Sequence, residues 1–276
     1  MKLLTLNTHS LVKGDGAWQA SVLAEAILEE RFDVIALQEV NQRRDGAVLD
    51  PRVLENFTAC SAAVPLREGN FAHEVVCRLG AEGERYHWCY LPVKIGYGKY
   101  DEGLAFLCRA PIASVDSALL SLRCDYGDWK TRRMLSIQPQ GGKEWFFNVH
   151  LGWWDDPEEP FVAHWIRLLP HLWEKQHAWV MGDFNSSSEV CGEGYDLVKQ
   201  SGLYDAYEMA KKKIGKGTAE AEIDGWHGRT VDTDALRIDQ IWASRARSIR
   251  TCRTLFDGER YPVISDHFGV AIETED

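Results

Sequence analysis

The chain has 276 residues, of which 45% are hydrophobic and 26% are charged, and these proportions exclude a disordered, collagen-like or coiled-coil protein. It carries 31 basic and 42 acidic side chains, a formal net charge of −11, which disfavours non-specific binding to duplex nucleic acid or to an anionic membrane. Seven cysteines, an odd number without a Cys-x-x-Cys pair, indicate free thiols rather than a disulfide framework or a thiolate zinc site.

The N-terminal run MKLLTLNTHS is apolar only briefly, because Thr5, Asn7 and His9 interrupt it too early for a signal peptide. No stretch of the sequence approaches the roughly 18 apolar residues that a membrane helix needs. We therefore expect a soluble, cytoplasmic protein with no membrane partner. Because neither a repeat nor a linker divides the chain, we expect a single domain over residues 1–276.

The first half of the chain is dominated by predicted strands. A strand over residues 2–8 is followed by a helix over 18–31, where apolar side chains recur at helical spacing, and by a short buried strand over 33–38. Residues 41–70 have weak signals, so we expect loops there. Further short strands are predicted over 86–91, 104–109, 112–120, 134–138 and 145–149.

A second long helix is predicted in the second half, starting at Asp155-Asp156-Pro157, with Pro170 kinking or ending it. Strands are predicted over 178–181, 238–243, 248–256 and 268–272. Many short strands with a few long outer helices favour an α/β (α+β) layered sandwich, whose sheets are covered on both faces.

Polar side chains occur where apolar strands end or begin, a placement that sets short side chains on a rigid scaffold. They are Asn7, Glu39, His150, Asp183, Asn185, Asp239, Asp266 and His267. Singly, each has a structural explanation, such as a turn cap for Asn7. Together, their carboxylate and amide oxygens suit Mg²⁺ or Mn²⁺ rather than zinc, and histidines beside carboxylates suit proton transfer. This combination indicates phosphoester hydrolysis.

Six segments in chain order carry a family resemblance: LTLNTH, IALQEV, FFNVHLG, VMGDFN, RIDQIW and SDHFGV. They resemble the endonuclease/exonuclease/phosphatase superfamily, and the resemblance spans nearly the whole chain. It implies a four-layer α/β sandwich, in which two packed mixed β-sheets are flanked by helices and the site lies at one end of the sheets. It also implies Mg²⁺-dependent phosphoester cleavage, with Mn²⁺ as a substitute.

The same resemblance implies roles for individual residues. The metal is assigned to Asn7, Glu39 and Asp266, whereas the attacking water and the phosphate are assigned to Asp183 and Asn185. The histidine pairs it implies are His267 oriented by Asp239, and His150 oriented by Glu102. Two choices stay open: either His267 or Asp183 is the general base, and either Arg132 or Arg133 contacts phosphate. His9 stands where the apurinic endonuclease branch has an Asp, which weakens a DNA-repair interpretation.

Several features favour a small substrate. The segment VHLGWWDDPEEPF, with KYDEGLAF and IDGWHGRTVDTD, resembles a bacterial branch that includes sugar-phosphate phosphatases such as maltose 6′-phosphate phosphatase. Aromatic faces stack on sugars, so we assign substrate binding to Trp153, Trp154 and Trp226, although packing explains them equally well. Insertions over residues 41–85 and 210–235 are expected to roof the site and to exclude a duplex.

We therefore expect a Mg²⁺-dependent phosphatase of a small phosphomonoester, such as a sugar phosphate. Two other enzymatic functions stay open, a nuclease and a sphingomyelinase-type phosphodiesterase. The missing secretion signal and membrane segment weaken the second of these. A non-enzymatic alternative is an inactive binding module of the same fold, which predicts gaps in the metal and histidine set, and the sequence has none.

Overall fold

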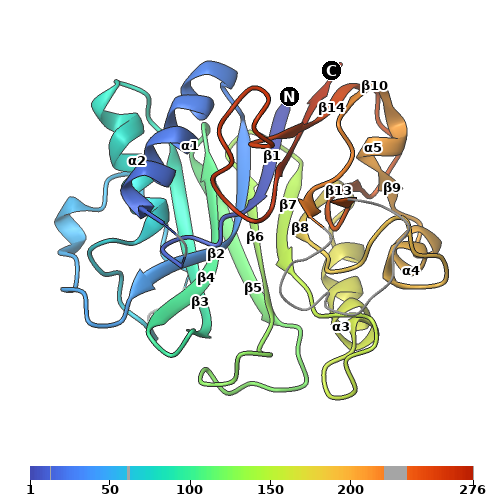
Figure 1. Ribbon diagram of the computed structural model, residues 1–276, viewed down its shortest axis with the longest axis horizontal. Helices are drawn as coiled ribbons and strands as arrows, with labels where there is room; N and C mark the ends of the chain where they lie inside the picture. Colours follow the sequence, from blue (N-terminus) through green and yellow to red (C-terminus); the bar gives the residue numbers. More distant parts are fainter. Residues whose placement is uncertain (13, 61–62, 221–234, 276) are drawn as a thin grey trace.

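Two β-sheets packed face to face form the centre of the protein, and helices cover both outer faces (Figure 1). The computed structural model describes all residues except 13, 61–62, 221–234 and 276. This arrangement confirms the predicted four-layer α/β sandwich with two mixed sheets. Within the described part of the chain, no helix has both the length and the apolar character needed to cross a lipid bilayer.

The first sheet has seven strands. They are β1 (Lys2–Asn7), β2 (Val34–Arg43), β3 (His87–Gly96), β4 (Tyr100–Cys108), β10 (Ala210–Ile214), β14 (Ile249–Leu255) and β15 (Gly269–Thr274). Their order across the sheet is β10-β14-β15-β1-β2-β4-β3. β1 lies at the centre, parallel to β2 and antiparallel to β15, so the N-terminal and C-terminal segments of the chain are neighbours.

The second sheet has six strands. They are β5 (Ile112–Leu119), β6 (Arg133–Pro139), β7 (Trp145–His150), β8 (Ala178–Asp183), β9 (Tyr204–Asp205) and β13 (Asp239–Ala243). Their order is β5-β6-β7-β8-β13-β9. A short two-stranded sheet pairs β11 (Ala219–Glu220) with β12 (Ala235–Leu236) in antiparallel register.

Successive side chains of a strand point to opposite faces of its sheet, and in both sheets apolar side chains occur on both faces, so both faces are buried. In β1, Leu3 joins the apolar layer between the sheets, whereas Leu4 and Leu6 face the outer helices. That outer layer is formed by α1 (Gly16–Glu30) and α2 (Phe71–Ala81). On the opposite side, α3 (Phe161–Trp173) and α4 (Gly194–Gln200) cover the six-stranded sheet. The remaining helical turns are α5 (Ala206–Met209) and the 3₁₀ turn η1 (Pro51–Val53).

Most predicted strands match observed ones, but one predicted helix starts later than expected and one observed helix was not predicted. The helix predicted to start at Asp155 begins instead at Phe161, because Pro160 occupies the N-cap position and the preceding loop turns back toward β7. No helix is predicted between the loops expected over 41–70 and the strand expected over 86–91, where the structure has α2, whose N-cap Asn70 accepts a hydrogen bond from the His73 N–H. Since α2 packs on the outer face of the sheet, this part of the insertion does not roof the site.

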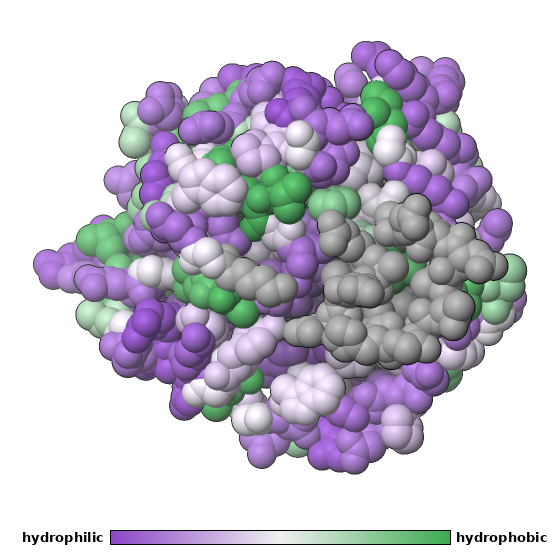
Figure 2. Space-filling model, viewed as in Figure 1, coloured by the Kyte–Doolittle hydropathy of each residue, from purple (hydrophilic) through white to green (hydrophobic). Residues whose placement is uncertain are grey.

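The surface of the described residues is largely polar on the face seen in Figure 2, where apolar side chains form small, separate patches. Such scattered apolar groups are ordinary for the exposed surface of a folded protein.

Candidate active site

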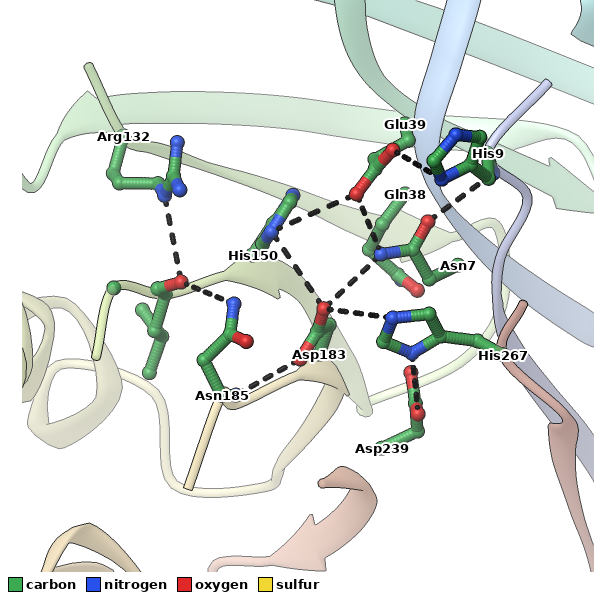
Figure 3. A network of polar contacts seen from close by, with 12 residues as sticks. Asn7, His9, Gln38, Glu39, Arg132, His150, Asp183, Asn185, Asp239 and His267 are labelled. Carbon is green, nitrogen blue, oxygen red and sulfur yellow. Dashed lines mark hydrogen bonds and ion pairs between the residues drawn. The ribbon is translucent and has the colours of Figure 1, made fainter. Parts of the chain in front are cut away.

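The polar residues that end the central strands meet at one end of the two sheets. Asn7 ends β1 and Glu39 lies within β2, both in the first sheet. His150 ends β7, Asp183 ends β8, and Asp239 opens β13 in the second sheet. The register places Asp183 beside both His150 and Asp239, so adjacent strands bring these three together. Residues far apart in the sequence therefore form one cluster (Figure 3).

Asn7 connects the carboxylates of the two sheets. Its amide Nδ2 donates to Glu39 Oε1 at 2.9 Å and to Asp183 Oδ2 at 3.0 Å. The Asn7 carbonyl Oδ1 accepts from the His9 N–H at 3.2 Å. Asn7 is fully buried and Asp183 is 1% exposed, so these contacts are shielded from solvent.

His9 also belongs to this cluster, although it has no role assigned from the sequence and a surface or core position is the favoured expectation. Its Nδ1 lies 3.0 Å from Asp266 Oδ2 and 3.6 Å from Glu39 Oε2. The signal that could have located it is its place in the first motif, two residues after Asn7, and the structure sets it in a left-handed turn after β1 with φ 40°. The imidazole thus lies between two of the carboxylates that the resemblance assigns to the metal.

His267 is held as the resemblance implies. Its Nδ1 donates to Asp239 Oδ2 at 2.9 Å, and its Nε2 lies 3.9 Å from Asp183 Oδ2 (Figure 3). Burial alone lowers the pKa of His267, but Asp239 and Asp183 outweigh it and raise the pKa to about 10. The imidazolium form is therefore the stable one at neutral pH.

His150 reaches the carboxylates from the second sheet, with Nε2 at 3.6 Å from Asp183 Oδ2 and 4.0 Å from Glu39 Oε1. Among the described residues, no hydrogen bond joins it to Glu102. The Glu102 carboxylate instead pairs with Lys94, whose Nζ lies 3.1 Å from Oε1. The implied orientation of His150 by Glu102 is thus absent from the described contacts. Burial and the Arg132 and Lys94 cations hold the pKa of His150 well below its usual value.

Arg132, rather than Arg133, lines the cavity of the site. Its Nε donates to the Leu151 carbonyl at 3.4 Å, and its Nη1 donates to the Trp129 carbonyl at 3.0 Å. Asn185 donates through Nδ2 to the same Leu151 carbonyl at 3.0 Å. Arg132 and Asn185 therefore share one backbone anchor at the start of the loop after β7.

A cavity of about 310 Å³ opens beside these residues. Its lining combines carboxylates and histidines with two buried cations, Arg132 and Lys94, the second of which pairs with the lining carboxylate of Glu102. Of the eight non-glycine residues with positive φ in the described ranges, four line this cavity: His9, Glu39, Tyr97 and Asn185. Backbone strain of this kind concentrates at functional sites, because the surrounding structure must maintain it.

The donor set fits a hard divalent cation. Carboxylate and amide oxygens of Asn7, Glu39, Asp183 and Asp266 lie in one cluster, and Asp239 Oδ1 is buried with no hydrogen-bond partner among the residues that the structure describes. One carboxylate oxygen each from Asp183 and Asp239 and a His267 nitrogen lie within 4.8 Å of one another. Burial raises the pKa of Glu39, and it raises the pKa of Asp183 to about 7. A bound cation would relieve the cost of these buried charges.

The three tryptophans assigned to substrate have different positions. Trp153 lines the cavity. Trp154 packs beside Phe161 with 6.3 Å between ring centroids, so it belongs to the apolar layer under α3 rather than to the cavity. Trp226 lies outside the described residues. Three further residues line the cavity without an assigned role from the sequence: Lys94 on β3, Tyr97 in the β3–β4 turn and Trp129 in the loop before β6.

A family comparison matches residues 4–267 to the endonuclease/exonuclease/phosphatase family. The chain belongs to this family. Its members are hydrolases that act on phosphoesters and generally depend on a divalent metal. A search of curated proteins gave no match.

Solved structures with the same fold include proteins of different activities. A family protein from Leptotrichia buccalis is 27% identical, with both chains fully covered and a TM-score of 0.85. A mannosyl-6-phosphatase from Bacteroides thetaiotaomicron is 20% identical, covering 99% of this chain and 98% of the other, with a TM-score of 0.65. A 3′-5′ exonuclease from Neisseria meningitidis is 18% identical, with 99% coverage of each chain and a TM-score of 0.65.

Proposed function

We propose that this phosphoesterase is a Mg²⁺-dependent phosphatase that releases phosphate from a small phosphomonoester such as a sugar phosphate. The observation that carries the proposal is the cavity itself. It combines a buried carboxylate cluster with two buried cations, Lys94 and Arg132. A terminal phosphate dianion matches two cations better than a phosphodiester does, because the monoester carries about one more negative charge.

The roles of the residues follow from their positions. Asn7, Glu39 and Asp266 would hold the cation, which supplies charge neutralisation at the phosphate when it is bound. Asp183 accepts the proton of the attacking water, because its carboxylate lies between the Asn7 amide and the two imidazoles. His267, fixed by Asp239, serves as a charged donor to a non-bridging oxygen. Arg132 and Asn185 both donate to the Leu151 carbonyl, which places them together as the remaining part of the phosphate site.

Two of the structural relatives agree with phosphate release as a chemistry of this fold. One is named a mannosyl-6-phosphatase, and a Neisseria protein is described as a 3′ phosphatase bound to a DNA hairpin. Both are below 25% identity, so the support for a sugar phosphate comes from the cavity and from the acidic net charge of −11.

The test is phosphate release from hexose 6-phosphates in parallel with nicking of plasmid and abasic DNA. We expect phosphate release that EDTA abolishes and that Mg²⁺ or Mn²⁺ restores, because only oxygen-preferring cations suit this donor set. Activity that zinc restores best would contradict the metal assignment. Efficient DNA cleavage without phosphate release from small esters would show that the protein is a nuclease.

A further inference from the structure

Three aromatic side chains stand at the edge of the cavity, beyond the polar residues assigned to the reaction. They are Tyr97, Trp129 and Trp153, and we call them the aromatic rim. Tyr97 and Trp129 are each 53% exposed, a large fraction for residues of this size. Aromatic rings normally bury their faces, so two half-exposed rings on one cavity offer solvent-accessible aromatic surface to a ligand.

The aromatic rim contacts the two cations of the cavity through the Trp129 backbone. The Trp129 carbonyl accepts hydrogen bonds from Lys94 Nζ at 2.9 Å and from Arg132 Nη1 at 3.0 Å. A phosphate bound at these cations would therefore lie close to the Trp129 backbone. The group esterified to that phosphate would extend over the neighbouring indole.

Ion pairs between two loops hold Trp129 and Trp153 of the aromatic rim in place. Lys130, next to Trp129, pairs with Asp156 at 2.8 Å and with Glu158 at 2.9 Å. These acids belong to the loop that carries Trp153, so the pairs hold the two indoles together, with centroids 5.9 Å apart and planes inclined by 56°. The two indoles are therefore preorganised, which lowers the conformational entropy lost when a ligand binds.

Tyr97 closes the opposite side of the rim. It is at the tip of the β3–β4 hairpin with φ 51°, and its hydroxyl lies 3.5 Å from His9 Nε2. The rim thus extends from the cations at Trp129 to the carboxylate cluster at His9. A group bound along it would contact aromatic surface at both ends.

We propose that the aromatic rim is the leaving-group subsite of this enzyme and that it selects phosphomonoesters whose alcohol is a pyranose-sized sugar ring. This inference rests on the proposed phosphatase function and adds the alcohol that the site selects. A puckered ring with C–H faces fits an inclined pair of indoles. A flat nucleobase can stack on one of these faces, but it cannot lie parallel to both inclined indoles at once.

The experiment compares three phosphomonoesters with the wild type and with Trp129→Ala. They are a hexose 6-phosphate, glycerol 3-phosphate, which has no ring, and adenosine 5′-monophosphate, which has a flat base. We expect Trp129→Ala to lower kcat/KM for the hexose phosphate by about tenfold, mainly through KM, because stacking energy is lost. Activity on glycerol 3-phosphate should change by less than about twofold, since the phosphate site is intact. Trp129→Phe should recover most of the loss.

A matched control is Trp173→Ala, which removes an indole that is 70% exposed at the end of α3. It should leave all three activities unchanged. An equal loss on the hexose and glycerol esters would assign Trp129 a structural role and overturn the subsite. A loss largest for the nucleotide would assign the rim to a base instead. A wild type that hydrolyses none of the three esters would refute the phosphatase function itself, which distinguishes the two failures.

Discussion

At the scale of single residues, the site depends on backbone conformations that side chains rarely adopt. Glu39 has φ 48° at a bulge in β2, where pairing with β4 shifts between Leu37 and Val40. Its carbonyl accepts hydrogen bonds from Thr8 Oγ1 and Ser10 Oγ, each at 3.0 Å. The residues that follow Asn7 in the sequence thus stabilise the conformation that aims Glu39 at the cavity.

The consequence of removing a single imidazole can be measured directly. We expect His267→Ala to lower kcat by about 10²-fold or more, because the variant loses a positioned group that the Asp239 carboxylate holds at 2.9 Å. His171→Ala is the matched control, since His171 lies on α3 and does not line the cavity. Steady-state kinetics of phosphate release provides the measurement. Full turnover in His267→Ala would remove this residue from the mechanism.

At the scale of elements, a buried pair outside the cavity, His164 and Glu159, joins the loops that carry Trp129 and Trp153. His164 of α3 accepts a hydrogen bond at Nδ1 from the Gly152 N–H, at 3.1 Å, and its Nε2 donates to Glu159 at 3.1 Å. Glu159 also accepts from the backbone N–H groups of Leu122 and Arg123. Gly152 is required there, because a Cβ would lie 2.8 Å from the His164 ring.

This pair predicts a pH dependence of stability. Burial, with the nearby Arg132 guanidinium, lowers the pKa of His164 from 6.5 to about 4. Between these values the unfolded chain binds more protons than the folded one, so the free energy of unfolding falls as the pH falls from about 6.5 toward 4. We expect the stability advantage of the wild type over His164→Gln to shrink by about 2 kcal/mol between pH 7 and 4.5. Urea denaturation at both pH values measures it, and a constant difference would contradict the neutral state of His164.

Residues at the ends of strands can be predicted from the sequence, whereas residues placed by turns and loops cannot. Residues at strand ends, such as Asp183 after AWVMG, are predictable because apolar runs locate the strands and the resemblance assigns the polar residues that follow. Gly182 of the same motif is explained only by packing, since a Cβ there would lie 1.9 Å from the Val149 carbonyl oxygen. Tyr97 and Trp129 are not predictable, because their position depends on how a hairpin and a loop fold over the cavity.

At the scale of the whole molecule, the cavity belongs to neither sheet alone. Asn7 and Glu39 come from the first sheet, and Asp183 from the second, and the apolar layer between the sheets sets their separation. The layer order was predictable from the family resemblance. The enclosure of the cavity was not, because the region expected to roof it includes α2, which covers the outer face of the first sheet.

The pairing of β1 with β15 has a practical consequence for protein engineering. Both strands have one end at the cavity and the other at the far side of the sheet, where the Met1 ammonium donates to Thr274 Oγ1 at 2.9 Å. A short linker could join Met1 to Glu275, and new termini could be opened at the exposed turn of Gly141 and Gly142 between β6 and β7. Such a circular permutant should keep the wild-type kcat/KM, and an inactive but folded permutant would show that chain connectivity matters to the site.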